Sequence, residues 1–465
     1  MKWHFKYKRR WRENAEKITE FFKFVNPYIL AFAIPIFMHL SLYTETTQIL
    51  WIIIYTLLLC LIALLSQKAM YVAVIVALAY LLSMIPRFNY QSRPIGEYLI
   101  NGEIIKVSKN YFVISDKGYN ILVFSRNLSV INLQEGSSVT INGELNSNLK
   151  SFNLDPNFLK SNSVSYVLEN PKIESLNPPI YNISNKINWY PYGYPFADKY
   201  WKTVVFGIYD SNNELINDIN KLNVLHLLVI SGLHFDILFV ILFWIFKPLS
   251  KRWKHTNKFV FLIVFLYLVL LRSFISGIRS FVMQAVKRKG TIGKRKTNFL
   301  DGWATAIVIV FLLNYQWVFS LSFLISFMSS FFALCIAKLL SHTKIKRNIW
   351  KTLIISVSLY LINLPILLKI NKYFNPFGLF FGVLLMPVFE LTFFVSVFCF
   401  WSLDFINAYY YALDVVLNFL IANSYPLEIN FKINWSLIFC MYIVWLSILA
   451  LVKIKQKNQP KLIYG

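Results

Sequence analysis

The chain has 465 residues, of which 57% are hydrophobic, 18% aromatic and only 15% charged, and its formal net charge is +25. Soluble domains carry about 25% charged residues, so the composition excludes an ordinary soluble domain as well as a disordered, collagen-like or disulfide-rich secreted chain. Several apolar runs reach the roughly 20 residues that span a bilayer as a helix. The composition therefore predicts an integral membrane protein.

The positive charge gathers at the ends of the apolar runs. Of the 47 Lys and Arg residues, 29 lie in 1–23, at Lys68, and in 247–258, 287–296, 338–351 and 453–461. Cytoplasmic loops collect such residues. The large polar region 87–200 holds 11 basic against 9 acidic residues, so the net charge indicates membrane topology rather than affinity for nucleic acid.

The four cysteines lie inside apolar runs without C-x-x-C spacing. This pattern predicts neither a disulfide framework nor a zinc site. We expect no metal and no cofactor.

The N-terminal part reads as a basic head followed by three membrane spans. Residues 1–26 form a cytoplasmic head without a signal-peptide cleavage site. Apolar spans near 27–43, 48–66 and 69–86 make up the segment 27–86. Three crossings from a cytoplasmic head leave Arg87 on the outer side.

The polar region 87–177 is predicted to be an outer β-domain. Turn-forming stretches separate five candidate strands, at 98–106, 110–115, 119–125, 137–144 and 163–168. Five short strands fit a small barrel, of which an OB-fold is one option. Periodicity leaves another small β-fold open.

A loop and a surface helix are expected over 178–222. Residues 178–200 are rich in Pro and Tyr and predict a loop near the outer membrane surface. Apolar residues at helical spacing over 203–222 predict an amphipathic helix on that surface.

A helical core is predicted over 223–453, followed by a cytoplasmic tail over 454–465. Its spans are 223–246, 258–275, 302–318, 320–340, 351–370, 376–402 and 434–452. The basic clusters require 276–286 to return to the cytoplasm as a short or re-entrant helix. We expect 403–433 to lie outside, and whether 376–402 crosses once or folds back at Pro387 stays open. The fold class is a polytopic α-helical membrane protein, with about 10 transmembrane or re-entrant helices and an inserted small all-β, OB-like domain on the outer face.

Polar residues interrupt the first span of this core. His226, Ser231, Gly232, His234 and Asp236 lie in an otherwise apolar stretch. An ionisable group at a helix centre costs about 2.5–3.5 kcal/mol on insertion scales, so such groups face protein or water. His226, Ser231 and His234 share a helical face. A polar pathway is favoured for the whole cluster over hydrogen bonding between neighbouring helices alone.

The next segment adds two arginines, Arg272 and Arg279, with Ser276 between them. We expect them to face the same polar cavity. An arginine there pairs with Asp236 or with a phosphate. For each arginine taken singly, pairing within the protein is the favoured interpretation.

In these patches the chain resembles the ComEC family of competence proteins, the inner-membrane channels for DNA uptake. The family's H-L-L-A-I-S-G-L-H-V is matched by His226-Leu-Leu-Val-Ile-Ser-Gly-Leu-His-Phe235 with two substitutions. Its P-S-x-x-R-A-x-x-M resembles Ile275-Ser-Gly-Ile-Arg-Ser-Phe-Val-Met283, and its F-Q-L-S-F resembles Phe319-Ser-Leu-Ser-Phe323. The order of helices, β-domain and helical core is similar too.

The resemblance implies an OB-like domain that binds single-stranded DNA by aromatic stacking. The candidate stacking residues are Tyr111, Phe112, Tyr119 and Phe124. About half of them have to be core in a small barrel. Asp236 departs from the family, which has glycine there. The H-x-H-x-D-H cluster of the family's metallo-β-lactamase-like domain does not occur in the sequence, so we expect strand degradation to come from a separate nuclease.

We therefore predict a channel for single-stranded DNA across the cytoplasmic membrane, not an enzyme. The lining would be His226, Ser231, Gly232, His234, Asp236, Arg272, Ser276 and Arg279. Expected partners are single-stranded DNA, the lipid bilayer, and a cytoplasmic ATP-driven translocase or single-strand-binding protein, since no G-x-x-x-x-G-K-[ST] loop is present. A homo-oligomer is left open.

Two alternatives come from other classes. One is a small-molecule or lipid transporter, which the lack of an inverted repeat of hydropathy disfavours. The other is an intramembrane serine hydrolase using Ser231 and His234. Three-residue spacing on one helix rarely brings a serine and its base to the required 2.6–3.2 Å, so it ranks lower.

Overall fold

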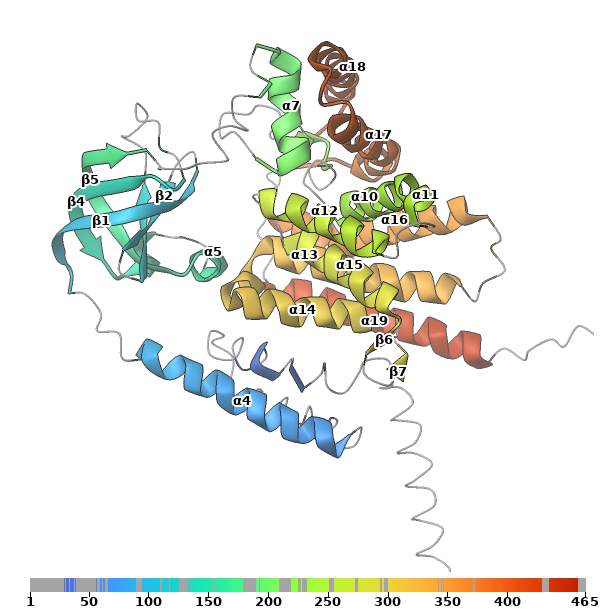
Figure 1. Cartoon of the computed structure of the whole chain (residues 1–465), viewed down its shortest axis with the longest axis horizontal. Helices are drawn as coiled ribbons and strands as arrows, with labels where there is room; N and C mark the ends of the chain where they lie inside the picture. The colour runs from blue at the N-terminus through green and yellow to red at the C-terminus, as the bar shows by residue number, and fades with distance from the viewer. Residues whose placement is uncertain are drawn as a thin grey trace, which may run out of the picture.

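A computed structural model gives the fold of a β-barrel joined to a helical core (Figure 1). It describes scattered positions between 29 and 62, then 66–88, 94–108, 111–116, 118–124, 133, 135–152, 154, 156–178, 190–191, 193–208, 219–224, 227, 232–250, 255–271, 275–292, 295–296, 300–341, 343, 345, 347–370, 373–428 and 435–458. Most residues of the first two predicted spans lie outside this set. The third predicted span lies within helix α4, Gln67–Phe88.

The predicted β-domain is a closed five-stranded barrel. Its strands are β1 (Gly96–Val107), β2 (Tyr111–Asp116), β3 (Tyr119–Phe124), β4 (Ser138–Asn146) and β5 (Val164–Asn177). They follow the order β1-β2-β3-β5-β4, with β3 and β5 parallel and the other pairs antiparallel. This is an OB-like barrel, so the choice that periodicity left open is decided by strand order. The strand starting at 163 is longer than predicted, because β5 continues to Asn177 along β4.

The barrel core comes from inward-facing aliphatic and aromatic residues such as Ile100, Phe112 and Ile141, which are fully buried. Gly102 sits where β1 passes close to β2, since an added Cβ would lie 2.5 Å from the Ser115 carbonyl oxygen. Between β4 and β5 lie η1 (Leu149–Phe152) and the short helix α5 (Pro156–Ser161). Figure 1 shows α5 on the side of the barrel that faces the helical core.

Most of the amphipathic helix predicted over 203–222 lies outside the described residues, so it stays a prediction. A described helix, α7 (Pro195–Phe206), begins inside the stretch predicted to be a loop. It ends because Gly207 adopts a left-handed conformation with φ of 66°, which caps the helix C-terminus. Seven of its residues are buried, so α7 is packed into the core rather than laid on a surface.

The helical core follows in chain order. Its helices are α10 (Gly232–Ile245), α11 (Lys247–Ser250), α12 (Thr256–Leu270), α13 (Ile275–Lys289), α14 (Asp301–Leu313), η2 (Tyr315–Phe319), α15 (Leu321–Leu340), α16 (Asn348–Ile370), α17 (Gly378–Phe398), α18 (Leu403–Ala422) and α19 (Trp435–Asn458). A hairpin of β6 (Thr291–Ile292) and β7 (Arg295–Lys296) joins α13 to α14. Within the predicted span 223–246 the described helix is α10, and Asn223 at the start of the span has a left-handed φ of 59°.

Four of the described helices are long and apolar enough to cross a membrane, namely α15, α16, α17 and α18. Shorter apolar helices include His234–Ile245, Thr256–Leu270 and Asp301–Leu313. The expected total of about ten membrane helices stays a prediction.

Helix α18 was missed by the sequence patterns, which left 403–433 as an outer segment. Helix α17 runs without a break through Pro387, so it does not fold back there. The strand β8 (Tyr373–Phe374) before α17 pairs with β9 (Leu427–Glu428) after α18. The chain therefore leaves along α17 and returns along α18 to the same place, and if one crosses the membrane the other crosses back.

Candidate functional site

Two of the sequence motifs, far apart along the chain, meet between α10 and α13, and α15, which begins within the third motif, adds a contact from Ser326. The Oγ of Ser280 on α13 donates to the carbonyl oxygen of Gly232 on α10, at 3.0 Å. The Nε of Arg279, the residue before it, donates to the Oγ of Ser326 on α15, at 2.9 Å. The motifs at 226–235 and 275–283 thus join directly, and the third, at 319–323, leads into the helix that carries Ser326.

Glycine at position 232 makes the close approach of α10 and α13 possible. A Cβ there would lie 2.0 Å from Nη2 of Arg279 and 2.4 Å from Oγ of Ser280. The guanidinium of Arg279 therefore lies against the backbone of α10. The side chain of any other residue at position 232 would have to displace the guanidinium of Arg279.

Asp236 lies one turn after Gly232 on the same face of α10. Its Oδ1 accepts a hydrogen bond from Nε2 of Gln284 at 2.7 Å. The pairs Gly232–Ser280 and Asp236–Gln284 each advance by four residues, so α10 and α13 run parallel here.

Helix α13 carries its polar residues on one face. At 100° per residue, Arg279, Ser280, Gln284 and Lys287 fall within less than half of the helix circumference, and so does Ser276. Ser276 and Ser280 are buried, whereas Lys287 is exposed in the last turn. This polar stripe leads from the partly buried Arg279 to the basic end of the helix. Gln284 was missed by sequence reasoning, although its position four residues after Ser280 places it on this face.

His234 does not join this site. It is 3% exposed, and its ring centroid lies 4.6 Å from that of Phe393 on α17. His234 lies two positions after Gly232 and two positions before Asp236, so its side chain is on the opposite side of α10 from theirs. His226, Ser231 and Arg272 lie outside the described residues, so their roles and the serine hydrolase alternative stay predictions.

The β-domain aromatics divide into one core residue and three partly exposed ones. Phe112 is fully buried in the barrel and has no free face for a base, which removes it from the stacking candidates. Tyr111 packs edge-on against Phe158, Tyr119 edge-on against Tyr166, and Phe124 against Phe152. These three rings stay candidates for stacking.

The barrel docks on the core through α5 and η2. The Nζ of Lys160 lies 5.7 Å from the ring centroid of Phe319, the residue that opens the third motif. Figure 1 shows α5 beside the ends of α13 and α14. The barrel is thus attached at the segment that leads into α15 and its Ser326.

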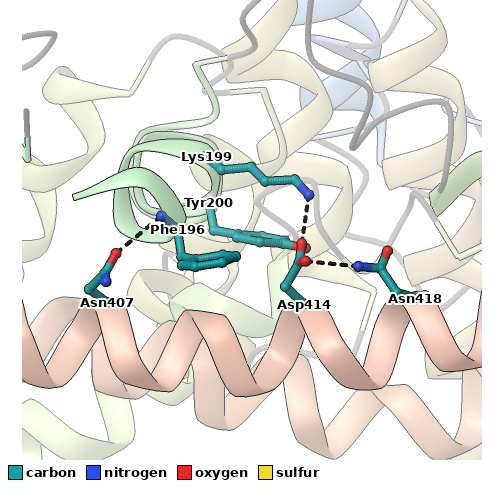
Figure 2. Close-up of polar contacts among 6 residues, drawn as sticks. All are labelled: Phe196, Lys199, Tyr200, Asn407, Asp414 and Asn418. Carbon is teal, nitrogen blue, oxygen red and sulfur yellow. Dashed lines mark hydrogen bonds and ion pairs between the residues drawn. The ribbon is translucent and has the colours of Figure 1, made fainter. Parts of the chain in front are cut away.

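A second polar cluster, which sequence reasoning did not find, joins α7 to α18 (Figure 2). The carboxylate of Asp414 accepts from Nζ of Lys199 and Oη of Tyr200, both at 2.6 Å, and from Nδ2 of Asn418 at 2.8 Å. About two turns earlier on α18, Oδ1 of Asn407 accepts from the backbone N–H groups of Phe196 and Ala197, at 3.1 and 3.2 Å.

This cluster fixes the position of α7. Tyr194 precedes the helix without a side-chain cap, so Asn407 supplies the N-terminal cap from a different helix. The rings of Tyr200 and Tyr410 also stack, with centroids 5.3 Å apart. No sequence signal links α7 to α18, since the residues that join the two helices are more than 200 positions apart. Within the described part of the chain, no three His, Cys, Asp or Glu side chains gather as metal ligands.

The fold and site together define a multi-helix membrane protein with an OB-like barrel and a partly buried arginine at the meeting point of three helices. A family model described as Competence protein matches residues 210–457, more than half of the chain. The chain belongs to this competence protein family, the ComEC family, as the motifs indicated.

Two curated relatives agree with this assignment. ComE operon protein 3 of Bacillus subtilis is 27% identical over 175 residues, which cover 38% of this chain and 22% of the relative. The uncharacterized protein MG316 of Mycoplasma genitalium is 28% identical over 186 residues, 40% of this chain and 47% of the relative. The matched regions thus span less than half of either relative. No solved structure matches the chain.

Proposed function

We propose that this protein is a channel that passes single-stranded DNA across the cytoplasmic membrane during DNA uptake. Membership of the competence family and the similarity to a ComE operon protein support a role in DNA uptake. The proposed substrate explains why an otherwise apolar helical core holds a cation and a polar stripe.

The observation that carries the proposal is the position of Arg279. Arginine binds phosphate through two parallel N–H···O bonds, which suits a chain with one phosphate in each nucleotide. Its partly buried position between α13 and the apolar helices α10 and α15 would be costly without a function, because intramembrane ionisable groups are expensive and line pathways. The stripe from Arg279 through Gln284 to Lys287 puts two cations and an amide on one face of α13, and a passing phosphate would replace partners within the protein such as Ser326 and Asp236.

The arrangement of the ends of α13 supports a direction. The barrel docks at η2, which follows α14, and the basic β6–β7 hairpin lies at the opposite end of the α13–α14 pair. Basic loops are typical of the cytoplasmic side. In this proposal the barrel is on the outer face and receives the strand, both termini are cytoplasmic, and cytoplasmic partners drive transport while a separate nuclease removes the other strand.

Uptake of labelled duplex DNA tests the proposal. Cells with the wild-type gene, without it, and with Arg279→Gln are exposed to DNA, treated with external nuclease and assayed for protected single strands. We expect the deletion to abolish protection with surface binding intact, and Arg279→Gln to lower it at least tenfold, since a charged hydrogen bond is worth about 1.5–3 kcal/mol.

Arg347→Gln is the matched control, because Arg347 is an exposed arginine before α16 and outside the site. It should leave uptake at the wild-type level. Unchanged uptake in the deletion strain would overturn the channel, and equal losses in the two arginine variants would overturn the role of Arg279.

A further inference from the structure

Arg279 is partly buried, and its polar contacts do not neutralise it. Its Nε donates to Ser326, and its Nη1 lies 3.6 Å from the sulfur of Met283. Within the described ranges no carboxylate lies close enough to form an ion pair with it. A buried cation without a paired anion is unfavourable, so the site needs negative charge nearby.

Asp236 supplies that charge from the next turn of α10. It is partly buried and held in place by Gln284 at 2.7 Å, one turn after the Gly232 backbone against which the guanidinium of Arg279 lies. Gln284 lies between Arg279 and Lys287 along α13, so the carboxylate adds negative charge to this stretch without closing an ion pair with Arg279. The sulfur beside Nη1 of Arg279 is a weak acceptor, so an anion would be a stronger partner for that nitrogen.

A phosphate that binds Arg279 would place its charge close to this carboxylate. Two anions near one cation repel each other, and the repulsion is strong where helices exclude water. The bound phosphate and Asp236 thus compete for the same positive charge.

We propose that Asp236 is the resident counter-anion of the Arg279 site and weakens phosphate binding there, so that a strand is held loosely and can move on. The proposal rests on the DNA-channel function. It assigns to Asp236 the control of affinity at that site, where its charge and not its hydrogen bonding is decisive.

The test is binding of a fluorescent 12-nucleotide oligothymidylate to the full-length protein in nanodiscs of neutral phosphatidylcholine, measured by anisotropy at several salt concentrations. Asp236→Asn preserves the size of the side chain and removes its charge. We expect the variant to bind the oligonucleotide about 5-fold to 150-fold more tightly than wild type, the range of typical coupling between two ligands. The control is Asp404→Asn, which removes an exposed carboxylate on α18 and should not change the affinity.

A double-mutant cycle locates the effect. The gain from Asp236→Asn should disappear in the Arg279→Gln background, because the oligonucleotide then has no guanidinium to compete for. If the wild-type protein binds the probe and Asp236→Asn binds it no better, the counter-anion proposal is wrong. A gain that persists without Arg279 also overturns it, whereas a complete lack of binding by every form contradicts the channel function itself.

Discussion

Gly232 provides the sharpest test of the site geometry, because one methyl group is enough to disturb it. In Gly232→Ala the new Cβ would lie 2.0 Å from Nη2 and 3.0 Å from Cζ of Arg279, and 2.4 Å from Oγ of Ser280. All three separations are far shorter than the 3.5–4.0 Å of an ordinary contact. The guanidinium and the hydroxyl must both move away from α10.

The cost of this substitution follows from the interactions lost. Moving Ser280 breaks its hydrogen bond to Gly232, and moving Arg279 weakens its bond to Ser326. Overpacking a well-packed interior costs about 1–3 kcal/mol. The higher helix propensity of alanine returns at most about 1 kcal/mol, and less at the first residue of a helix. We expect a net loss of about 1–2 kcal/mol and a large loss of DNA uptake.

A matched control lies on α17. Gly382 is also a glycine within an apolar helix, but nothing lies within 4 Å of the Cβ that alanine would add. Gly382→Ala should keep normal uptake and be neutral or slightly stabilised. The assays are thermal unfolding of the purified protein in detergent and nuclease-protected uptake in cells. Equal behaviour of the two variants would refute the close approach of α10 and α13 around Arg279.

Two further predictions concern the anchoring of α7 on α18. Asp414→Asn removes the charge that accepts from Lys199 and Tyr200. It should lower the free energy of unfolding by about 2 kcal/mol, the cost of a charge-assisted hydrogen bond in a partly exposed pair, read from the denaturation midpoint with Asp404→Asn as the control. Asn407→Ala removes the cap of α7 and should cost about 1 kcal/mol, with faster amide exchange confined to the first turn of α7. If exchange accelerates instead throughout α7 and α18, Asn407 does more than cap.

The sequence predicted best what depends on neighbouring residues. All five barrel strands were located within a few residues, because alternation and turns are local signals. The C-terminal end of β5 could not be predicted from local signals, since its extension to Asn177 depends on pairing with β4, which lies earlier in the chain. Arg279 and the polar residues of the first core span were expected to face one cavity, and the structure supplies the contacts between α10 and α13.

Other features depend on residues too far apart for any pattern to reveal. The placement of α7 is set by α18 side chains more than 200 positions later, so no local pattern indicated a helix within the stretch predicted to be a loop. Helix α18 was missed because its apolar stretch is interrupted by Asp414 and Asn418, and both of these belong to the polar cluster with α7. Polar residues lower the mean hydropathy of a stretch, so the sequence patterns indicated a loop there. In the structure, a neighbouring helix supplies hydrogen-bond partners to Asp414.

The dimensions of the polar stripe place Arg279 within a longer path. Ser276 and Lys287 are separated by eleven residues, about 17 Å along a helix axis at 1.5 Å per residue. The hydrocarbon core of a bilayer is about 30 Å thick, so in the proposed channel α13 would line little more than half of a crossing. Other elements would provide the rest of that path, with the docked barrel at one end and the basic hairpin at the other. A strand would then pass Arg279 as one of several contacts, and a site that many phosphates pass in succession has to release each of them. A cation balanced by Asp236 at a short distance meets that requirement better than an unbalanced one, because each phosphate gains only part of the attraction of a free arginine.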